Sequence, residues 1–219
     1  MKDEALRNEI CEVCRLLYDR GYVVSNDGNV SARTERNTVL ITPSGVGKGR
    51  VTPEMLVETD LEGNVLSGDR FPSSEGKMHW MIYRKRPDVG AVVHAHPPYS
   101  TAFAICRKPL KEAYLAELII GLGDVPVTDF AMLSTDEVPR SVEPFTADHN
   151  AVLLANHGSL AWGPTLLSAF DRLETVEQTA HIHYLVSQIG GGVEIPAEQA
   201  DALRAKRAYY QKLAGKREQ

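Results

Sequence analysis

Three histidines in this sequence have the spacing of metal ligands. His94 and His96 are separated by one residue at the end of an apolar run that begins at Val89. If this run is a strand, both imidazoles project to the same side, because side chains alternate between the two faces of a strand. His157 follows a second apolar run, AVLLA at residues 151–155. Three neutral imidazoles, with one position left for a carboxylate or a substrate, are the ligand set of a catalytic zinc ion.

Glu75 could supply the carboxylate of such a site. It stands at the expected start of a helix, and His79 lies one turn further along the same helical face. We expect His79 to be a hydrogen-bonded partner of the site rather than a ligand. The alternative is that His94 and His96 only satisfy hydrogen bonds within a sheet. A third histidine at the end of another apolar strand favours the metal site over this alternative.

Two polar turns and a helix start could together bind an anion. The turns are SNDGNVS at residues 25–31 and PSG at residues 43–45, both rich in hydroxyl, amide and backbone N–H groups. Such turns bind anions when they converge, although either one alone could be a plain surface turn. Ser74 is expected to cap the helix that begins near Glu75, where free N–H groups favour phosphate. The run GVGKGR does not fit the phosphate-loop pattern, so we reject a nucleotide-binding loop.

The pattern of apolar residues predicts an alternation of helices and strands. Helical spacing and strand-like runs follow one another along the chain, with turn residues between them. Helices are predicted over residues 3–20, from 75 onward, 97–107, 113–122, from 135 through the 140s, 164–188 and 197–214. Strands are predicted over residues 30–32, 38–42, 89–96, 125–130, 151–155 and 159–162, with a hairpin within 55–66. Because no repeat or linker interrupts this alternation, residues 1–219 are predicted to form one α/β domain.

Glu117 is a carboxylate in an otherwise apolar helical segment, EAYLAELIIGLG. Two interpretations of it remain open. Its side chain either extends to solvent or faces the metal pocket, where partial burial would raise its pKa and allow proton exchange near neutral pH.

Composition and charge exclude several classes of protein. The chain has 219 residues, of which 43% are hydrophobic and 24% are charged, as in globular proteins. A net charge of −5 provides no basic field for nucleic acid or membrane. No signal-like start and no long apolar run are present, so we expect neither secretion nor membrane insertion. Three cysteines, an odd number, fit a reducing cytoplasm, and Cys11 and Cys14 suit the apolar face of a helix better than a redox pair.

Five segments together resemble the class II aldolase/adducin family. GNVSAR, TVLITPSG, PSSE, VVHAHPPYSTAFA and LLANHG occur in the family's order, and the likeness covers roughly residues 5–190. The branch that it resembles most contains L-fuculose-1-phosphate aldolase and related ketose-1-phosphate aldolases. The resemblance implies a single α/β domain with a central mixed, largely antiparallel sheet flanked by helices. It also implies a homotetramer with its sites near subunit contacts.

The resemblance also assigns roles to residues. It implies that His94, His96 and His157 bind Zn²⁺, for which Mn²⁺ or Co²⁺ could substitute. Glu75 would alternate between metal ligand and catalytic base. The substrate phosphate would be held by Asn29, Thr42, Ser44, Gly45, Ser73 and Ser74. The expected reaction is the reversible cleavage of a short ketose 1-phosphate, such as L-fuculose or 5-deoxyribulose 1-phosphate, to dihydroxyacetone phosphate and an aldehyde.

The chain departs from the fuculose-phosphate aldolases at one catalytic position. Where they carry a tyrosine acid, this sequence has Glu117, with Tyr114 three residues earlier. Methylthioribulose-1-phosphate dehydratases of the same family use a glutamate in an equivalent helix, so that activity is an alternative, as is a sugar-phosphate epimerase. The intact Ser-Ser-Glu element favours the aldolase, and the complete ligand set disfavours an adducin-type interaction module. Tyr209 or Tyr210 could close over the pocket.

Overall fold

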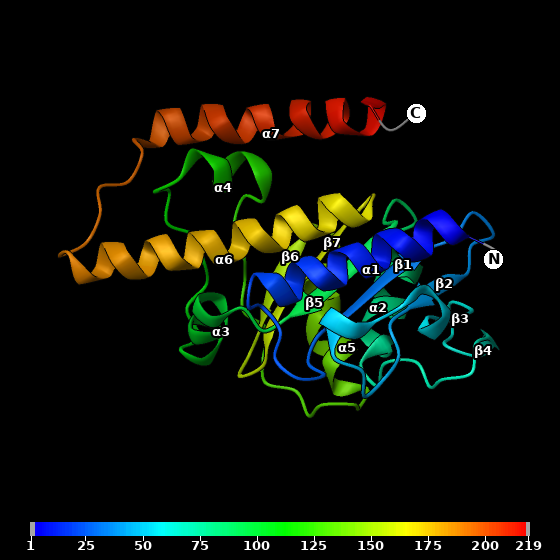
Figure 1. The fold of residues 1–219 in the computed structure, drawn as a ribbon. Coiled ribbons are helices and arrows are strands. Elements are labelled where there is room, and N and C mark those ends of the chain that lie inside the picture. The colour runs from blue at the N-terminus through cyan, green and yellow to red at the C-terminus, as the bar shows by residue number, and fades with distance from the viewer. Residues whose placement is uncertain (1–2, 218–219) are drawn as a thin grey trace.

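The computed structural model describes residues 3–217, which are arranged around one seven-stranded sheet (Figure 1). The strands are β1 (Asn29–Arg33), β2 (Val39–Ile41), β3 (Val57–Thr59), β4 (Val65–Ser67), β5 (Ala91–Ala95), β6 (Ala151–Leu154) and β7 (Gly158–Gly163). Their order across the sheet is β4-β3-β2-β1-β5-β7-β6. Every neighbouring pair is antiparallel, and among residues 3–217 the one parallel contact is an isolated bridge between Val127 and Leu153. The expected α/β fold with a largely antiparallel sheet is therefore confirmed.

Helices cover both faces of this sheet (Figure 1). They are α1 (Glu4–Asp19), α2 (Gly76–Lys85), α3 (Pro98–Ile105), α4 (Ala116–Gly121), α5 (Glu137–Val142), α6 (Leu166–Gln188) and α7 (Ala197–Arg217). Short 3₁₀ helices occupy Lys48–Arg50, Pro53–Met55 and Glu143–Phe145. α7 packs on α4, which in turn contacts α6. Within residues 3–217, no helix is both long enough and apolar enough to cross a membrane.

The central strand β5 shows how the sequence places the two layers. All five of its residues are buried. Ala91, Val93 and Ala95 face the core that is shared with α1 and α6, whereas Val92 faces the core that is shared with α2 and α5. Because side chains alternate, His94 lies on the α2 face together with Val92. A run of small and β-branched residues thus forms a doubly buried strand that carries one polar side chain toward α2.

Most predicted elements are present, and two predictions are wrong. The helix after Ser74 begins at Gly76, with Glu75 at its N-cap position and no capping bond from a side chain. Ser73 instead accepts a 3.3 Å hydrogen bond from the backbone N–H of Glu75. Residues 125–130 form no strand, only single bridges at Val125 and Val127. Pro126 lies between these two residues and lacks the N–H group that a continuous ladder needs.

We predict that Gly28→Ala destabilises the fold more than Gly21→Ala does. Both glycines have φ near +70°, but only Gly28 lacks space for a Cβ. A Cβ at Gly28 would lie 2.7 Å from the carbonyl oxygen of His94 and 2.7 Å from Val23, whereas nothing lies within 4 Å at Gly21. Backbone strain should cost about 1 kcal/mol at either position, and overpacking about 1–3 kcal/mol more at Gly28. Denaturant unfolding measures both losses, and equal losses would contradict the prediction.

Candidate metal centre

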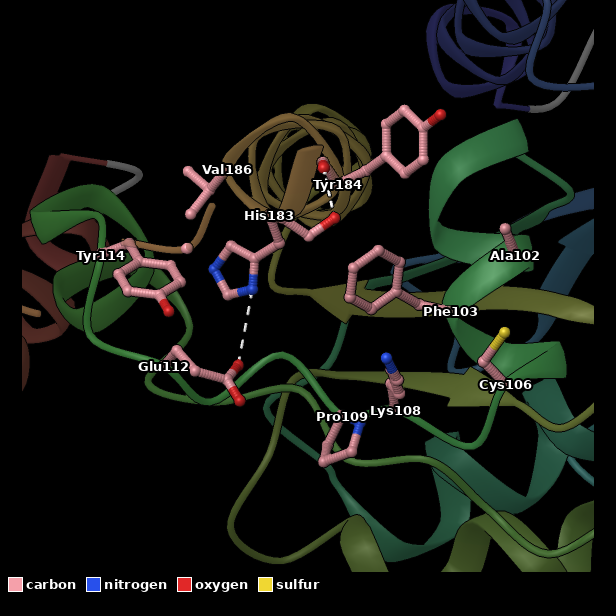
Figure 2. Close-up of a pocket in the computed structure, with 12 residues that line it drawn as sticks. Ala102, Phe103, Cys106, Lys108, Pro109, Glu112, Tyr114, His183, Tyr184 and Val186 are labelled. Carbon is pink, nitrogen blue, oxygen red and sulfur yellow. Dashed lines mark hydrogen bonds and ion pairs between the residues drawn. The ribbon is translucent and has the colours of Figure 1, made fainter. Parts of the chain in front are cut away.

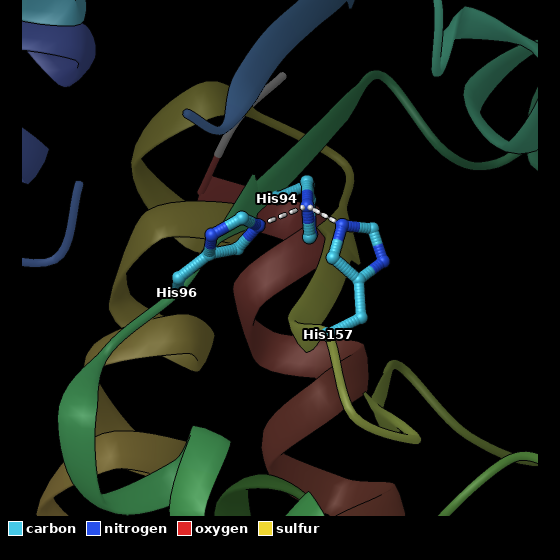
Figure 3. A group of neighbouring side chains, drawn as sticks. All are labelled: His94, His96 and His157. Carbon is cyan, nitrogen blue, oxygen red and sulfur yellow. Dashed lines mark hydrogen bonds between the residues drawn. The ribbon is translucent and has the colours of Figure 1, made fainter. Parts of the chain in front are cut away.

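The three predicted histidines converge on one point (Figure 3). Nε2 of His94 lies 3.0 Å from Nε2 of His96 and 3.2 Å from Nε2 of His157. Zinc–nitrogen bonds of about 2.0–2.1 Å at tetrahedral angles would separate two ligand nitrogens by roughly 3.4 Å. The spacing of the three nitrogens therefore matches the requirement of a single divalent ion.

The end of strand β5 and the tight turn between β6 and β7 bring these rings together. His94 and His96 come from the end of β5, and the backbone N–H of His96 donates to the carbonyl of Tyr22 at 2.9 Å. His157 lies in the turn between β6 and β7, where Asn156 has a positive φ of 56°. A Cβ on Gly158 would lie 2.4 Å from the Ala95 carbonyl oxygen and 2.7 Å from the His96 ring. Only glycine permits the close approach of this turn to β5.

The proton positions of His94 and His96 suit metal binding. Nδ1 of His94 lies 2.9 Å from the carbonyl oxygen of Ser159. Because a carbonyl only accepts, Nδ1 carries the proton and Nε2 keeps a lone pair. Nδ1 of His96 lies 3.5 Å from a carboxylate oxygen of Asp27, a partner that sequence reasoning missed. Burial lowers the pKa of His94 well below its ordinary value, and burial together with His157 lowers the pKa of His96. Neutral imidazoles are the form that binds metals.

Glu75 reaches the same point from the start of α2. Its Oε1 lies 3.0 Å from Nε2 of His157, and its Oε2 lies 3.5 Å from Nε2 of His94. The side-chain amide of Asn29 donates to Oε2 at 2.8 Å. Burial alone would raise the pKa of Glu75, but the two imidazoles and the Asn29 hydrogen bond outweigh it and hold that pKa below its ordinary value. An ionised carboxylate therefore stands where a fourth ligand belongs.

A buried chain of hydrogen bonds fixes the orientation of Asn29. Its Oδ1 lies 2.5 Å from Nε2 of His79, whose Nδ1 lies 2.7 Å from the Ser31 hydroxyl. The Ser31 hydroxyl is in turn 2.8 Å from the hydroxyl of Tyr83. If His79 carries its proton on Nε2, each bond runs in one direction, from Tyr83 through Ser31 and His79 to Asn29 and then to Glu75. The expected role of His79 as a hydrogen-bonded partner is confirmed.

The turns that were predicted to bind phosphate lie side by side. The Thr42 hydroxyl accepts from the backbone N–H of Val30, next to Asn29, and the Thr42 carbonyl accepts from the N–H of Ser73. Ser44 donates its N–H to the carbonyl of Phe71. Asn29, Thr42 and Ser73 are buried, whereas Ser44, Gly45 and Ser74 are exposed. All six predicted residues therefore belong to adjoining segments near the histidines, and whether they bind phosphate stays a prediction.

Lys48 is a buried residue of this region that the sequence did not reveal. Its ammonium group donates to the backbone carbonyls of Asn26 and Val46, both at 2.9 Å. It thereby ties the turn before Asn29 to the turn after Gly45. Burial lowers the pKa of Lys48. The only signal in the sequence was a lysine within the glycine-rich run GVGKGR, which does not by itself indicate burial.

Glu117 and Tyr114, the candidates for the acid of the reaction, do not belong to the histidine cluster. Glu117 is exposed on α4, and within residues 3–217 no hydrogen bond or ion pair joins it to the histidine cluster. Tyr114 lines a separate cavity of about 600 Å³, together with Phe103, Glu112 and His183 (Figure 2). In that cavity the Tyr114 and His183 rings lie 5.0 Å apart, and Nδ1 of His183 lies 3.5 Å from Glu112.

Within residues 3–217, the two C-terminal tyrosines contact each other and make no hydrogen bond to the histidines. Tyr209 and Tyr210 are exposed on α7, with ring centroids 5.7 Å apart. One chain therefore brings together the predicted metal ligands and the adjoining turns, but not the predicted acid groups.

Comparison with known proteins gives consistent matches. Residues 8–184 match the family model described as Class II Aldolase and Adducin N-terminal domain. A solved structure of L-fuculose 1-phosphate aldolase superposes with a TM-score of 0.87 at 34% identity, covering 94% of this chain and 97% of that one. A 3-oxo-tetronate 4-phosphate decarboxylase of Haemophilus influenzae is 34% identical over 84% of this chain and 89% of its own length. A 5-methylthioribulose-1-phosphate/5-deoxyribulose-1-phosphate aldolase of Rhodospirillum rubrum is 34% identical, covering 92% and 90%.

We predict that the protein binds one divalent ion per chain and that His157→Ala weakens this binding at least about 100-fold. Loss of an outer partner of a metal ligand costs about 10–100-fold, and loss of a ligand should cost more. His181→Ala is the matched control, because His181 stacks on Tyr99 at 3.9 Å and takes no part in the cluster. Competition with a chromophoric chelator measures each affinity. Equal affinities of His157→Ala and wild type would contradict the assignment.

We predict that acidification destabilises the metal-free protein through His79. Burial lowers the pKa of His79 to about 3, against the opposing effect of Glu75. Between about pH 6.5 and 3 the unfolded chain therefore binds a proton at this residue that the folded chain does not. As the pH is lowered through this range, the free energy of unfolding should decrease by about 1.4 kcal/mol per pH unit from this residue alone. Unfolding of wild type and His79→Gln at pH 5 to 6 measures the two slopes, and identical slopes would contradict the prediction.

Proposed function

This chain belongs to the class II aldolase and adducin family and is a metal-dependent lyase, and we propose that its substrate is a short ketose 1-phosphate. The proposed substrates are of the L-fuculose 1-phosphate or 5-deoxyribulose 1-phosphate type, cleaved reversibly to dihydroxyacetone phosphate and an aldehyde. One observation carries the proposal. An ionised Glu75, oriented by Asn29, stands beside three convergent imidazoles, which combines a metal site and a base in one place.

We propose that His94, His96, His157 and Glu75 hold a zinc ion. Nitrogen and carboxylate donors suit Zn²⁺, and Mn²⁺ and Co²⁺ accept the same set. Such an ion supplies Lewis acidity, which stabilises the negative charge that carbon–carbon cleavage leaves on the carbonyl oxygen and its neighbouring hydroxyl. The donor set fits this role, because the tautomer of His94 is fixed by Ser159 and the carboxylate is already ionised.

Glu75 is proposed to move the proton at the reacting carbon. In the cleavage direction the bond between C3 and C4 of the ketose breaks, and its electron pair stays on C3 next to the C2 carbonyl. The C4 hydroxyl loses its proton and becomes the aldehyde, while C3 gains a proton to give dihydroxyacetone phosphate. Because Asn29 binds only one oxygen of Glu75, the other oxygen can turn from the histidines toward this carbon.

The adjoining turns are proposed to hold the phosphate. Asn29 retains a second amide hydrogen, Thr42 and Ser73 contribute hydroxyl groups, and the backbone around Ser44, Gly45 and Ser74 is exposed. Lys48 fixes the two turns relative to each other through two backbone carbonyls. A phosphate held by these turns would position the substrate, and the C3–C4 bond would remain free to react.

We propose that the acid on the aldehyde side comes from another copy of the chain. Glu117 is exposed and, within residues 3–217, makes no hydrogen bond or ion pair with its own histidines. In the proposed homotetramer with sites near subunit contacts, it would act at a neighbour's site. Large apolar side chains that such a contact would cover are exposed on the monomer, among them Phe71, which is 86% exposed and lies two residues before Ser73. Tyr114 and the pair Tyr209 and Tyr210 are the other candidates for this acid.

Location and organisation follow as further parts of the proposal. Residues 1–219 are proposed to form one domain. All three cysteines, Cys11, Cys14 and Cys106, are free in the structure, which supports a reducing cytoplasm. With a net charge of −5, neither nucleic acid nor membrane is a proposed partner.

A decarboxylase is the second candidate, favoured by the relative from Haemophilus influenzae. Loss of carbon dioxide from a 3-oxo-tetronate 4-phosphate leaves an electron pair on C2, next to the C3 carbonyl. Protonation of that carbon also gives dihydroxyacetone phosphate. The two reactions therefore share the electron-rich intermediate and the proton transfer, and they differ only in the group that leaves. The dehydratase considered above is less well supported, because Glu75 of the intact Ser-Ser-Glu element stands beside the histidines.

We predict that the zinc-loaded protein releases dihydroxyacetone phosphate from L-fuculose 1-phosphate or 5-deoxyribulose 1-phosphate. Glu75→Gln should lower kcat by about 10²–10⁴, the usual worth of a positioned general base. A coupled assay measures dihydroxyacetone phosphate, and mass spectrometry detects the aldehyde. The control is Glu54→Gln, an exposed carboxylate that is not part of the cluster, which should leave kcat unchanged.

The same assay with two further substrates separates the alternatives. Dihydroxyacetone phosphate and carbon dioxide from 3-oxo-tetronate 4-phosphate, without cleavage of any ketose, would make the protein a decarboxylase. Loss of water from methylthioribulose 1-phosphate, without dihydroxyacetone phosphate, would make it a dehydratase.

A further inference from the structure

A buried glutamate on α6 binds the start of the helix that follows the His-Ala-His strand. Glu177 is only 5% exposed. Its Oε1 accepts the backbone N–H of Tyr99 at 2.9 Å, and its Oε2 accepts the backbone N–H of Ser100 at 2.8 Å. Both oxygens of one side chain from a distant part of the sequence are therefore used on the first turn of α3.

The local sequence cannot cap this helix by itself. α3 begins at Pro98 with Pro97 at the N-cap, and neither proline has an N–H group or a side-chain acceptor. Tyr99 and Ser100 thus carry the first N–H groups of the helix, at a place where Ser100 is fully buried. Unpaired N–H groups are costly there, and a carboxylate at a helix N-terminus is also favoured by the helix dipole.

The start of α3 connects to the metal centre by two short routes. The first is covalent, because His96 precedes Pro97 directly. The second is a hydrogen-bond route: the Ser159 hydroxyl donates to the Ser100 hydroxyl at 2.9 Å, and the Ser159 carbonyl lies 2.9 Å from Nδ1 of His94. Ser100, Ser159 and His94 are each at most 1% exposed, so water does not compete for these bonds.

We propose that Glu177 is a positioning residue for the metal centre. By clamping the first turn of α3, it fixes the backbone at His96 and, through Ser100 and Ser159, the ring of His94. The inference rests on the metal centre of the proposed function and not on the identity of the substrate. Hydrogen-bonded groups behind metal ligands orient those ligands and raise affinity. Glu177 extends this support to a third layer, on a helix that contributes no ligand.

The experiment measures metal affinity and the absorption spectrum of the Co²⁺ form in wild type and three variants. Glu177→Gln keeps size but turns an amide NH₂ toward one of the two N–H groups, so one hydrogen bond is lost. Ser100→Ala leaves both N–H bonds and removes the hydroxyl, which accepts from the Ser159 hydroxyl and donates to the Pro97 carbonyl at 3.4 Å. Val176→Ala is the matched control, because it removes buried apolar volume one residue from Glu177 without touching α3's N–H groups.

The expected results separate positioning from general stability. Glu177→Gln should weaken Co²⁺ and Zn²⁺ binding about 10–100-fold and shift the Co²⁺ absorption bands. Ser100→Ala should weaken binding about 3–10-fold with a smaller spectral shift, and it decides the question if Glu177→Gln does not fold. Val176→Ala should lower Tm and leave affinity within about twofold, as expected for a change that touches no partner of the ligands.

Three results would overturn the inference. Wild-type affinity and spectrum in both Glu177→Gln and Ser100→Ala would show that Glu177 only caps a helix. Equal loss of affinity in Val176→Ala would show that any loss of stability has this effect. A wild-type protein that binds no divalent metal would refute the metal centre as well, whereas failure of the variants alone leaves the proposed lyase intact.

Discussion

The convergence of three imidazoles on one point is the constraint on which the rest of the site depends. Nε2 of His94 can accept one good hydrogen bond, yet two other ring nitrogens face it at 3.0 and 3.2 Å. A cation satisfies all three nitrogens at once, so the protein must hold the rings in this arrangement before the cation arrives. The register of β5, the glycine at residue 158 and the carbonyl of Ser159 each remove one freedom that the rings would otherwise use.

Glu75, the carboxylate beside these rings, is also held in place by its neighbours. A glutamate that serves both as ligand and as base must stay ionised and must be able to turn. His94, His157 and the Asn29 amide together lower the pKa of Glu75 and keep it ionised. Asn29 leaves Glu75 able to turn, because it donates to only one oxygen of the carboxylate and is itself held by His79. The directional chain that starts at Tyr83 keeps the amide from rotating by 180° and presenting its oxygen to the carboxylate. This chain of hydrogen bonds thus keeps the NH₂ group of Asn29 directed toward Glu75.

Sequence patterns predicted the parts of this structure that depend on local spacing. The period of two in the run that ends at His96 placed two predicted ligands on one face, and the apolar run before His157 placed the third. The strand expected at residues 125–130 does not form. Pro126 has no N–H group to donate to a neighbouring strand, so only single bridges remain at Val125 and Val127. Lys48 and Glu177 went unrecognised for a different reason. Their roles arise from partners 22 and 78 residues away, and no local pattern encodes such pairings.

The division of the site between what one chain contains and what it lacks has a chemical meaning. The predicted metal donors, the predicted base and the adjoining turns come from β1, β5, α2, the turn between β6 and β7, and the turns beside β1 and α2. In the proposed reaction these groups would act on the half of the substrate that keeps the electron pair, and that half is the same whether an aldehyde or carbon dioxide departs. Glu117, the predicted acid, is exposed on α4 and makes no hydrogen bond or ion pair with this cluster within residues 3–217. Relatives named for different leaving groups can therefore share this arrangement. The residues that select the leaving group would lie outside the set of groups that stabilise the electron pair.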